Sequence, residues 1–162
     1  MLFMNELTSQ SCSSFPEREQ RIIDMALKLL DQRIRKKGYF MDSPEGVRTY
    51  LRLNLEHLER EVFIVMFLDN QHRLIASETL FLGTINATAV YPREVVRMAL
   101  SFNAAAVVLS HNHPSGNAAP SSADHAITKK LVTALALIDV KVLDHIVVGH
   151  GEMVSFAERG WL

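Results

Sequence analysis

Apolar positions along the chain recur with two periods, and the change of period marks where helices give way to strands. From Pro16, apolar residues return every three or four positions, as on the buried side of an amphipathic helix. That side is predicted to carry Ile22, Met25, Ala26, Leu29 and Leu30. A second helix is predicted from Ser43-Pro44, an N-cap followed by proline at the first helical position, to about Leu58.

The middle of the chain has the pattern of strands, interrupted by one helix. Val62–Leu68 is a continuous apolar run, Asp69-Asn70 is a turn signal, and Leu74–Ile85 is mixed and β-prone. The two runs are therefore predicted to form a hairpin. Pro92 begins a third helix, and the short apolar run Ala104–Leu109 is typical of a central buried strand.

The last third of the chain alternates between the two periods again. A polar loop, Ser110–Pro120, precedes a helix from Ser121 to about Ile138, a strand at Val140–Val148 and a short strand at Met153–Phe156. Strands interleaved with helices in a chain of 162 residues predict one compact α/β domain. We expect a mixed β-sheet sandwiched by helices.

Charge and composition narrow the classes of function. The net charge of -1 provides no global field that would attract nucleic acid. We interpret the basic run from Arg33 to Lys37 as a solvated helix end rather than a nucleic-acid contact. Cys12 is the only cysteine, which excludes Cys-rich zinc sites. No secretory signal and no run of about 18 apolar residues is present, so we expect a cytoplasmic protein without a membrane partner.

Candidate chemistry is concentrated where the buried strand ends. His111 and His113 are two residues apart, so in an extended chain both imidazoles point to the same side. The apolar stripe of the next helix, extended backward from Leu131, passes through Asp124 in its first turn. A buried carboxylate is costly unless it is paired or coordinates a metal. Two histidines and an aspartate suit Zn²⁺, and three protein ligands leave a fourth position open for water, as in catalytic zinc sites.

A second interpretation of these residues needs no metal. The spacing of Ser121 and Asp124 resembles a capping box, and the two histidines are then satisfied polar residues of a loop. This interpretation does not explain the His-x-His spacing or the inward direction of Asp124, so we favour the metal site. His145, in an apolar strand, either supports the site or is a hydrogen-bonded core histidine. His125 points about 100° away from Asp124 and is expected in solvent.

Four residues together resemble the motif of a known superfamily. His111, His113, Ser121 and Asp124 match, position for position, the pattern His-x-His, seven residues, Ser, two residues, Asp of the JAMM (MPN-plus) metalloproteases. Within that superfamily the chain is similar to the RadC family. The segments that carry this similarity are 111–116, 120–121, 83–86, 92–94 and 143–149.

The resemblance implies a fold, a cofactor and roles for individual residues. It implies a JAMM/MPN-like (cytidine-deaminase-like) domain over residues 42–162, preceded by a leader and helix over 1–41. It further implies Zn²⁺, hydrolysis of a peptide or isopeptide bond in a peptide or protein substrate, and Ser121 as a donor to the oxyanion. The family's general base and acid is a glutamate. Glu61 holds the matching place, and Glu78 is the alternative.

Three other functions compete with this one. Zinc nucleobase deaminases need a Pro-Cys-x-x-Cys segment that a chain with one cysteine does not contain. The RadC family is named for a proposed link to DNA repair, which makes a DNA-associated accessory role an alternative. Longer members carry an N-terminal helix-hairpin-helix region, and we expect the first 41 residues to be too few for one. A metal-binding scaffold without hydrolysis is the third possibility, and the sequence does not predict the oligomeric state.

Overall fold

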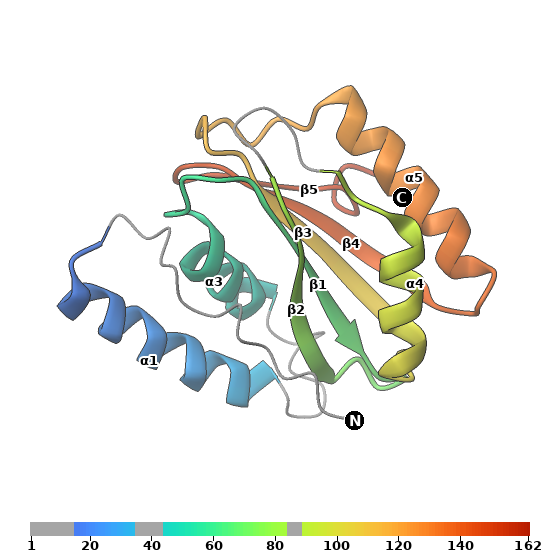
Figure 1. Cartoon of the computed structure of the whole chain (residues 1–162), viewed down its shortest axis with the longest axis horizontal. Helices are drawn as coiled ribbons and strands as arrows, with labels where there is room; N and C mark the ends of the chain where they lie inside the picture. Colours follow the sequence, from blue (N-terminus) through green and yellow to red (C-terminus); the bar gives the residue numbers. More distant parts are fainter. Residues whose placement is uncertain (1–14, 35–43, 84–88) are drawn as a thin grey trace.

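A mixed β-sheet covered by helices on both faces forms the body of the molecule (Figure 1). The computed structural model describes residues 15–34, 44–83 and 89–162. Its elements, in chain order, are α1 (Glu17–Ile34), α3 (Pro44–Leu55), β1 (Val62–Leu68), β2 (Leu74–Leu82), α4 (Pro92–Ser101), β3 (Ala106–Asn112), α5 (Ser122–Ala136), β4 (Lys141–Val148) and β5 (Met153–Ser155). The predicted fold class, an α/β sandwich around a mixed sheet, is confirmed.

The five strands of the sheet lie in the order β2-β1-β3-β4-β5. β1 pairs antiparallel with both β2 and β3, β3 pairs parallel with β4, and β4 pairs antiparallel with β5. The parallel pair is joined through α5, as a parallel connection requires a long crossover. Every residue of β1 and β3 is buried, which explains why these two strands are apolar over most of their length.

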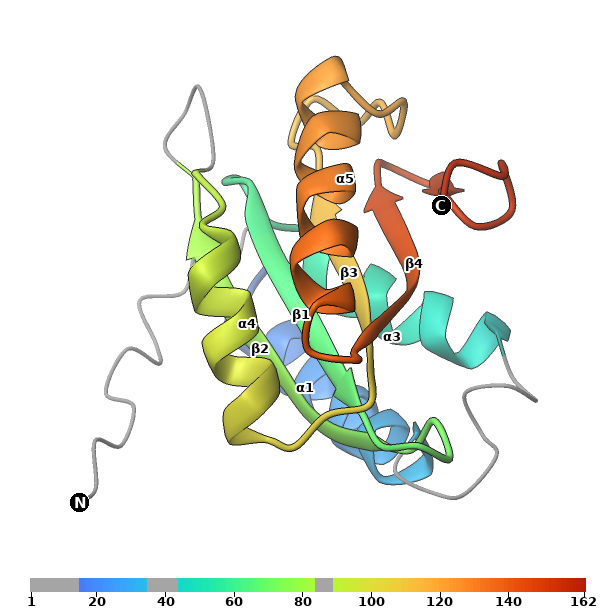
Figure 2. The ribbon, with the colours of Figure 1, turned by 90° about the vertical axis from the view of Figure 1, so that its right-hand side faces the viewer.

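Each face of the sheet has its own core. We call the side covered by α1 and α3 the α3 face, and the side covered by α4 and α5 the α5 face. Alternate residues of β1 pack into the two cores. Ile64 and Met66 lie on the α3 face, and Phe63 and Val65 lie on the α5 face. Figure 2 shows α4 and α5 lying next to each other over the sheet, with α1 and α3 behind it.

The predicted buried side of the first helix is partly wrong. Ala26 and Leu30 are half-buried as predicted, but the neighbouring Leu27 packs on the core with Leu30. The members of the predicted stripe that are exposed are Ile22, Met25 and Leu29, at 63%, 67% and 55%. The helix carries two adjacent apolar stripes with the same spacing, and α3 covers only one of them.

Some element boundaries also differ from the prediction. The second helix ends at Leu55, and β3 continues through Asn112, so His111 lies on a strand instead of in a loop. The strand continues because its last residues still pair with β1 and β4. The parts of the predicted leader, basic run, second helix and hairpin that fall on residues 1–14, 35–43 and 84–86 lie outside the described residues. None of the helices that the structure describes has the length and apolar character needed to cross a membrane.

Candidate metal centre

The candidate site is built at the carboxyl end of β3. His111 lies between Phe63 of β1 and Val147 of β4 and is buried. His113 follows two residues later on the same side, with its Nε2 atom 3.0 Å from Nε2 of His111. Both rings therefore lie on the α5 face, as the i, i+2 spacing predicts.

Asp124 reaches the histidines from the first turn of α5. Its Oδ1 lies 3.2 Å from Nε2 of His111, and its Oδ2 lies 3.4 Å from Nε2 of His113. Ligand atoms about 2.0–2.1 Å from a tetrahedral zinc ion lie about 3.3 Å from one another. The three contacts are close to that spacing, and the group could bind a metal ion.

The capping box considered as the alternative interpretation is also present. The backbone N–H and the hydroxyl of Ser121 donate to Oδ2 of Asp124, each over 2.7 Å, and the N–H of Asp124 donates back to Oγ of Ser121. One carboxylate therefore caps the helix and faces the two histidines at the same time. The cap accounts for Ser121 and Asp124 but not for the convergence of the imidazoles.

Charges at the site are strongly coupled. Burial acts to raise the pKa of Asp124, but the adjacent rings of His111 and His113 and the hydrogen bond from Ser121 hold this pKa well below its usual value. The hydrogen bond to Asp124 raises the pKa of His113. Partial burial opposes this rise, whereas the Asn117 carbonyl and the charge of Glu61 add to it. The site therefore favours a carboxylate next to a cation.

A backbone carbonyl orients the ring of His113. Its Nδ1 lies 2.8 Å from the oxygen of Asn117, which can only accept, so Nδ1 carries the hydrogen and Nε2 faces Asp124. The loop that supplies this carbonyl packs against the turn after β4. A Cβ on Gly149 would lie 2.3 Å from the oxygen of Gly116 and 2.8 Å from the nitrogen of Ala118. Only glycine allows that approach.

His145 of β4 supports the other histidine. Its Nε2 lies 2.8 Å from Nδ1 of His111, and its Nδ1 lies 2.6 Å from the hydroxyl of Thr128 on α5. Burial is the main reason why the pKa of His145 lies well below its usual value, so the ring is neutral. The two interpretations left open for this residue hold together: it is a hydrogen-bonded core histidine and it contacts the site. Thr128 was not singled out from the sequence, although it follows Asp124 by one helical turn.

Asn112, between the two histidines, points to the α3 face. Its side-chain amide accepts from the N–H of Val62 over 2.7 Å and donates to the carbonyls of Leu58 and Arg60. It therefore holds the segment that leads into β1. This role is not apparent from the sequence, because the three partners lie at least 50 residues away.

The segment held by Asn112 carries Glu61, the favoured candidate base. The β1–β3 pairing ends with Phe63 opposite His111, so Glu61, two residues before Phe63, lies at the same end of the sheet as His113. The backbone oxygen of Glu61 also accepts from the N–H of Gly83. Glu78 pairs instead with Val65, two residues along β1 from Phe63, the residue that pairs with His111. The charge of Glu61 contributes to the raised pKa of His113, so this carboxylate lies within electrostatic reach of one candidate ligand.

Two further features lie apart from the group. His125 is exposed but not simply solvated, because its ring contacts those of Phe156 and Trp161, with centroids 4.9 and 4.8 Å away.

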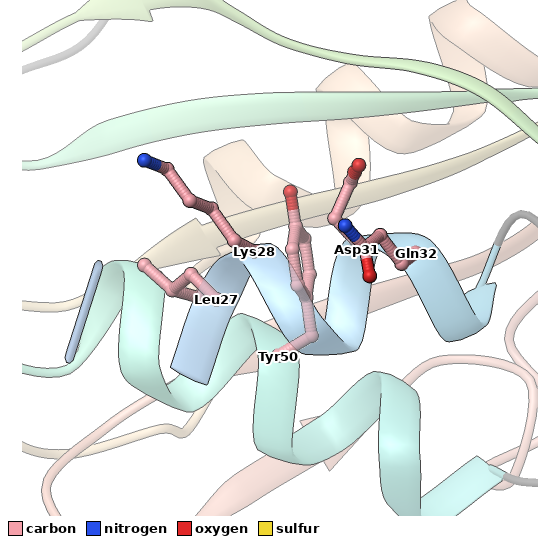
Figure 3. A pocket seen from close by; sticks show the side chains of 5 residues that line it. All are labelled: Leu27, Lys28, Asp31, Gln32 and Tyr50. Carbon is pink, nitrogen blue, oxygen red and sulfur yellow. The ribbon is translucent and has the colours of Figure 1, made fainter. Parts of the chain in front are cut away.

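A hollow of about 300 Å³ lies between α1 and α3 on the α3 face (Figure 3). It is lined by Leu27, Lys28, Asp31, Gln32 and Tyr50 and contains none of the candidate ligands.

Comparisons with known proteins point to one family. A family model described as the RadC-like JAB domain matches residues 41–161. A UPF0758 protein of Photobacterium profundum is 55% identical over 143 residues, and one of Cellvibrio japonicus is 58% identical over 143 residues. These matches cover 88% of this chain, which spans only 63% of the length of either relative. The UPF0758 protein YkfG of Escherichia coli is 54% identical over 144 residues, with 89% of this chain and 91% of YkfG covered.

Proposed function

The chain belongs to the RadC family, and from that premise we propose that it is a zinc-dependent hydrolase whose metal is held by His111, His113 and Asp124. The observation that carries the proposal is the convergence of two Nε2 atoms and a carboxylate at the spacing of tetrahedral ligands. Three protein ligands leave one position open, as a catalytic zinc site requires.

The neighbouring residues suit the hydrolysis of an amide. When bound, Zn²⁺ would lower the pKa of water toward neutrality and polarise a carbonyl. Glu61, whose charge acts on His113, would accept the proton of the attacking water and pass it to the leaving amine. Ser121 would donate to the oxyanion, and for this its hydroxyl has to turn away from Asp124.

The proposed substrate is a peptide or isopeptide bond in a peptide or protein, and the proposed compartment is the cytoplasm. Both follow from the family resemblance and the composition, and the UPF0758 names of the relatives state no activity. A DNA-bound role has weaker support, since the net charge is -1.

Metal analysis tests the ligands. The purified full chain is expected to bind zinc in a one-to-one ratio, and His113→Ala is expected to lose this zinc. His125→Ala removes a histidine that is next in sequence to Asp124 but directed at Phe156 and Trp161, so it is expected to bind zinc as wild type does. Wild type without zinc, or His113→Ala with a full equivalent, would contradict the site.

Glutamate variants test the chemistry. Glu61→Gln is expected to keep zinc and to lose at least about 100-fold in cleavage of quenched fluorescent peptides, linear or isopeptide-linked. Glu78→Gln is the matched control and is expected to remain active. Activity that survives in the first variant and vanishes in the second would make Glu78 the base. A wild type that binds zinc but cleaves none of these peptides would favour the scaffold.

A further inference from the structure

Thr128 has one hydroxyl hydrogen and two polar neighbours on different elements. Its Oγ1 lies 2.6 Å from the backbone oxygen of Asp124 and 2.6 Å from Nδ1 of His145. A carbonyl oxygen can only accept, and two oxygens at 2.6 Å repel unless a hydrogen lies between them. The hydroxyl of Thr128 therefore donates to Asp124. It can then only accept from His145, whose Nδ1 must carry a hydrogen.

The position of the hydrogen on His145 determines which ring nitrogen of His111 carries a hydrogen. A neutral imidazole has one N–H and one lone pair, so Nε2 of His145 is an acceptor. Nδ1 of His111, 2.8 Å away, therefore donates to it. The lone pair of His111 is left on Nε2, the atom that lies 3.2 Å from Asp124 and 3.0 Å from His113.

From this chain of contacts we infer that Thr128 and His145 are positioning residues that fix the Nδ1–H tautomer of His111 and keep its Nε2 free for a metal ion. The inference rests on the metal site proposed above. This series of hydrogen bonds begins at the backbone carbonyl of Asp124 and ends beside the carboxylate of that same residue. The helix that supplies one candidate ligand thereby orients another.

The two candidate histidine ligands reach the same state by different routes. His113 donates directly to the Asn117 carbonyl, which is fixed as an acceptor. His111 depends on two intermediate side chains, both of which are buried. Replacing the hydroxyl of Thr128 by a methyl removes the acceptor for His145. His145 can then place its hydrogen on Nε2 and donate to His111, which moves the hydrogen of His111 to the metal-binding nitrogen.

The test reads the protonated nitrogen of each imidazole in the metal-free full chain. Long-range proton–nitrogen NMR of protein labelled with ¹⁵N-histidine is expected to show Nδ1–H tautomers for His111 and His145. Thr128→Val is expected to shift both toward Nε2–H and to weaken zinc binding about 10-fold to 100-fold. Thr128→Ser keeps the hydroxyl and is expected to retain the wild-type tautomers and zinc affinity.

The outcomes separate positioning from packing. Wild-type protein with His111 in the Nε2–H form would overturn the inference even if no variant folds. Equal losses of zinc affinity in Thr128→Val and Thr128→Ser, without any tautomer change, would also overturn it, because they would indicate a packing role. The expected tautomers in a wild type that binds no zinc would uphold the orientation of His111 and contradict the proposed function.

Discussion

The two faces of the sheet use buried polar residues for different purposes, and the end of β3 shows this most clearly. On the α3 face, Ser110 donates to the carbonyl of Ile146 and Asn112 bonds three backbone groups. On the α5 face, His111 bonds to other side chains and directs its Nε2 at Asp124. Successive residues of β3 thus stabilise the backbone on one face of the sheet and contribute to the candidate metal site on the other.

This comparison gives a way to sort buried polar groups in a fold of unknown function. A side chain whose hydrogen bonds all end on backbone is satisfied by the fold. Side chains that contact one another and converge on one point could in addition hold a cation. Ser110 and Asn112 belong to the first kind, and His111, His113 and Asp124 to the second.

The largest effect on stability is expected on the α3 face. Asn112→Ala removes one acceptor and two donors and leaves the N–H of Val62 and the carbonyls of Leu58 and Arg60 without this partner. At roughly 1–3 kcal/mol for the buried N–H of Val62 and about 1 kcal/mol for each of the two part-buried carbonyls, the free energy of unfolding is expected to fall by about 3–5 kcal/mol. Urea denaturation of the metal-free protein measures this change.

Ser110→Ala is the matched control for that variant. It lies on the same strand and face but removes one hydrogen bond, so a loss of about 1 kcal/mol is expected. Folded Asn112→Ala is expected to retain zinc. If it lost the metal while keeping its stability, the division between the two faces would be wrong at Asn112.

A smaller effect, which depends on pH, is expected on the α5 face. In the metal-free protein, Asp124 keeps its charge to unusually low pH because His111 and His113 outweigh its burial, and its hydrogen bond to His113 raises the pKa of that ring. The contribution of Asp124 to the free energy of unfolding is fully present above the ordinary pKa of an aspartate and is lost as the pH falls below it. The contribution of His113 is fully present below about pH 6.5 and is lost as the pH rises through the pKa of His113 in the folded protein.

Asp124→Asn isolates this contribution. The difference in unfolding free energy between wild type and Asp124→Asn, both metal-free, is expected to reach on the order of 1 kcal/mol between about pH 4 and 6.5 and to shrink on either side. The lowered pKa of His145 changes stability in the opposite sense, but it affects both proteins and largely cancels. A difference that grows steadily above pH 7 would contradict the pairing of His113 with Asp124.

The smallest effect is expected on the outer side of α1. Met25→Ser replaces an exposed side chain, so the free energy of unfolding is expected to change by less than about 0.5 kcal/mol. Leu30→Ala, on the side that packs against the core, is expected to cost about 1–2 kcal/mol. Equal losses in the two variants, measured by thermal unfolding, would show that both stripes of the helix are covered in solution.

Local patterns predicted the parts of the molecule that depend on neighbours in sequence. The alternation at His111 and His113 placed both rings on one face, and the phase of α5 placed Asp124 inward. Roles that depend on distant partners were not predicted. Asn112 bonds to segments at least 50 residues away, and Thr128 meets His145 across 17 residues and two elements. The buried side of α1 was misjudged for the same reason, since only its contact with α3 selects one of two equal stripes.

The close approach at Gly149 means that the turn after β4 limits the position of the loop containing Gly116 and Ala118. Two backbones meet there with no side chain between them, so the clearance is already at its minimum and the loop cannot move inward. Any added atom at this position has to push outward the loop that begins at His113 and holds its ring through Asn117. A residue without a side chain thus limits how close to β4 the loop after His113 can lie.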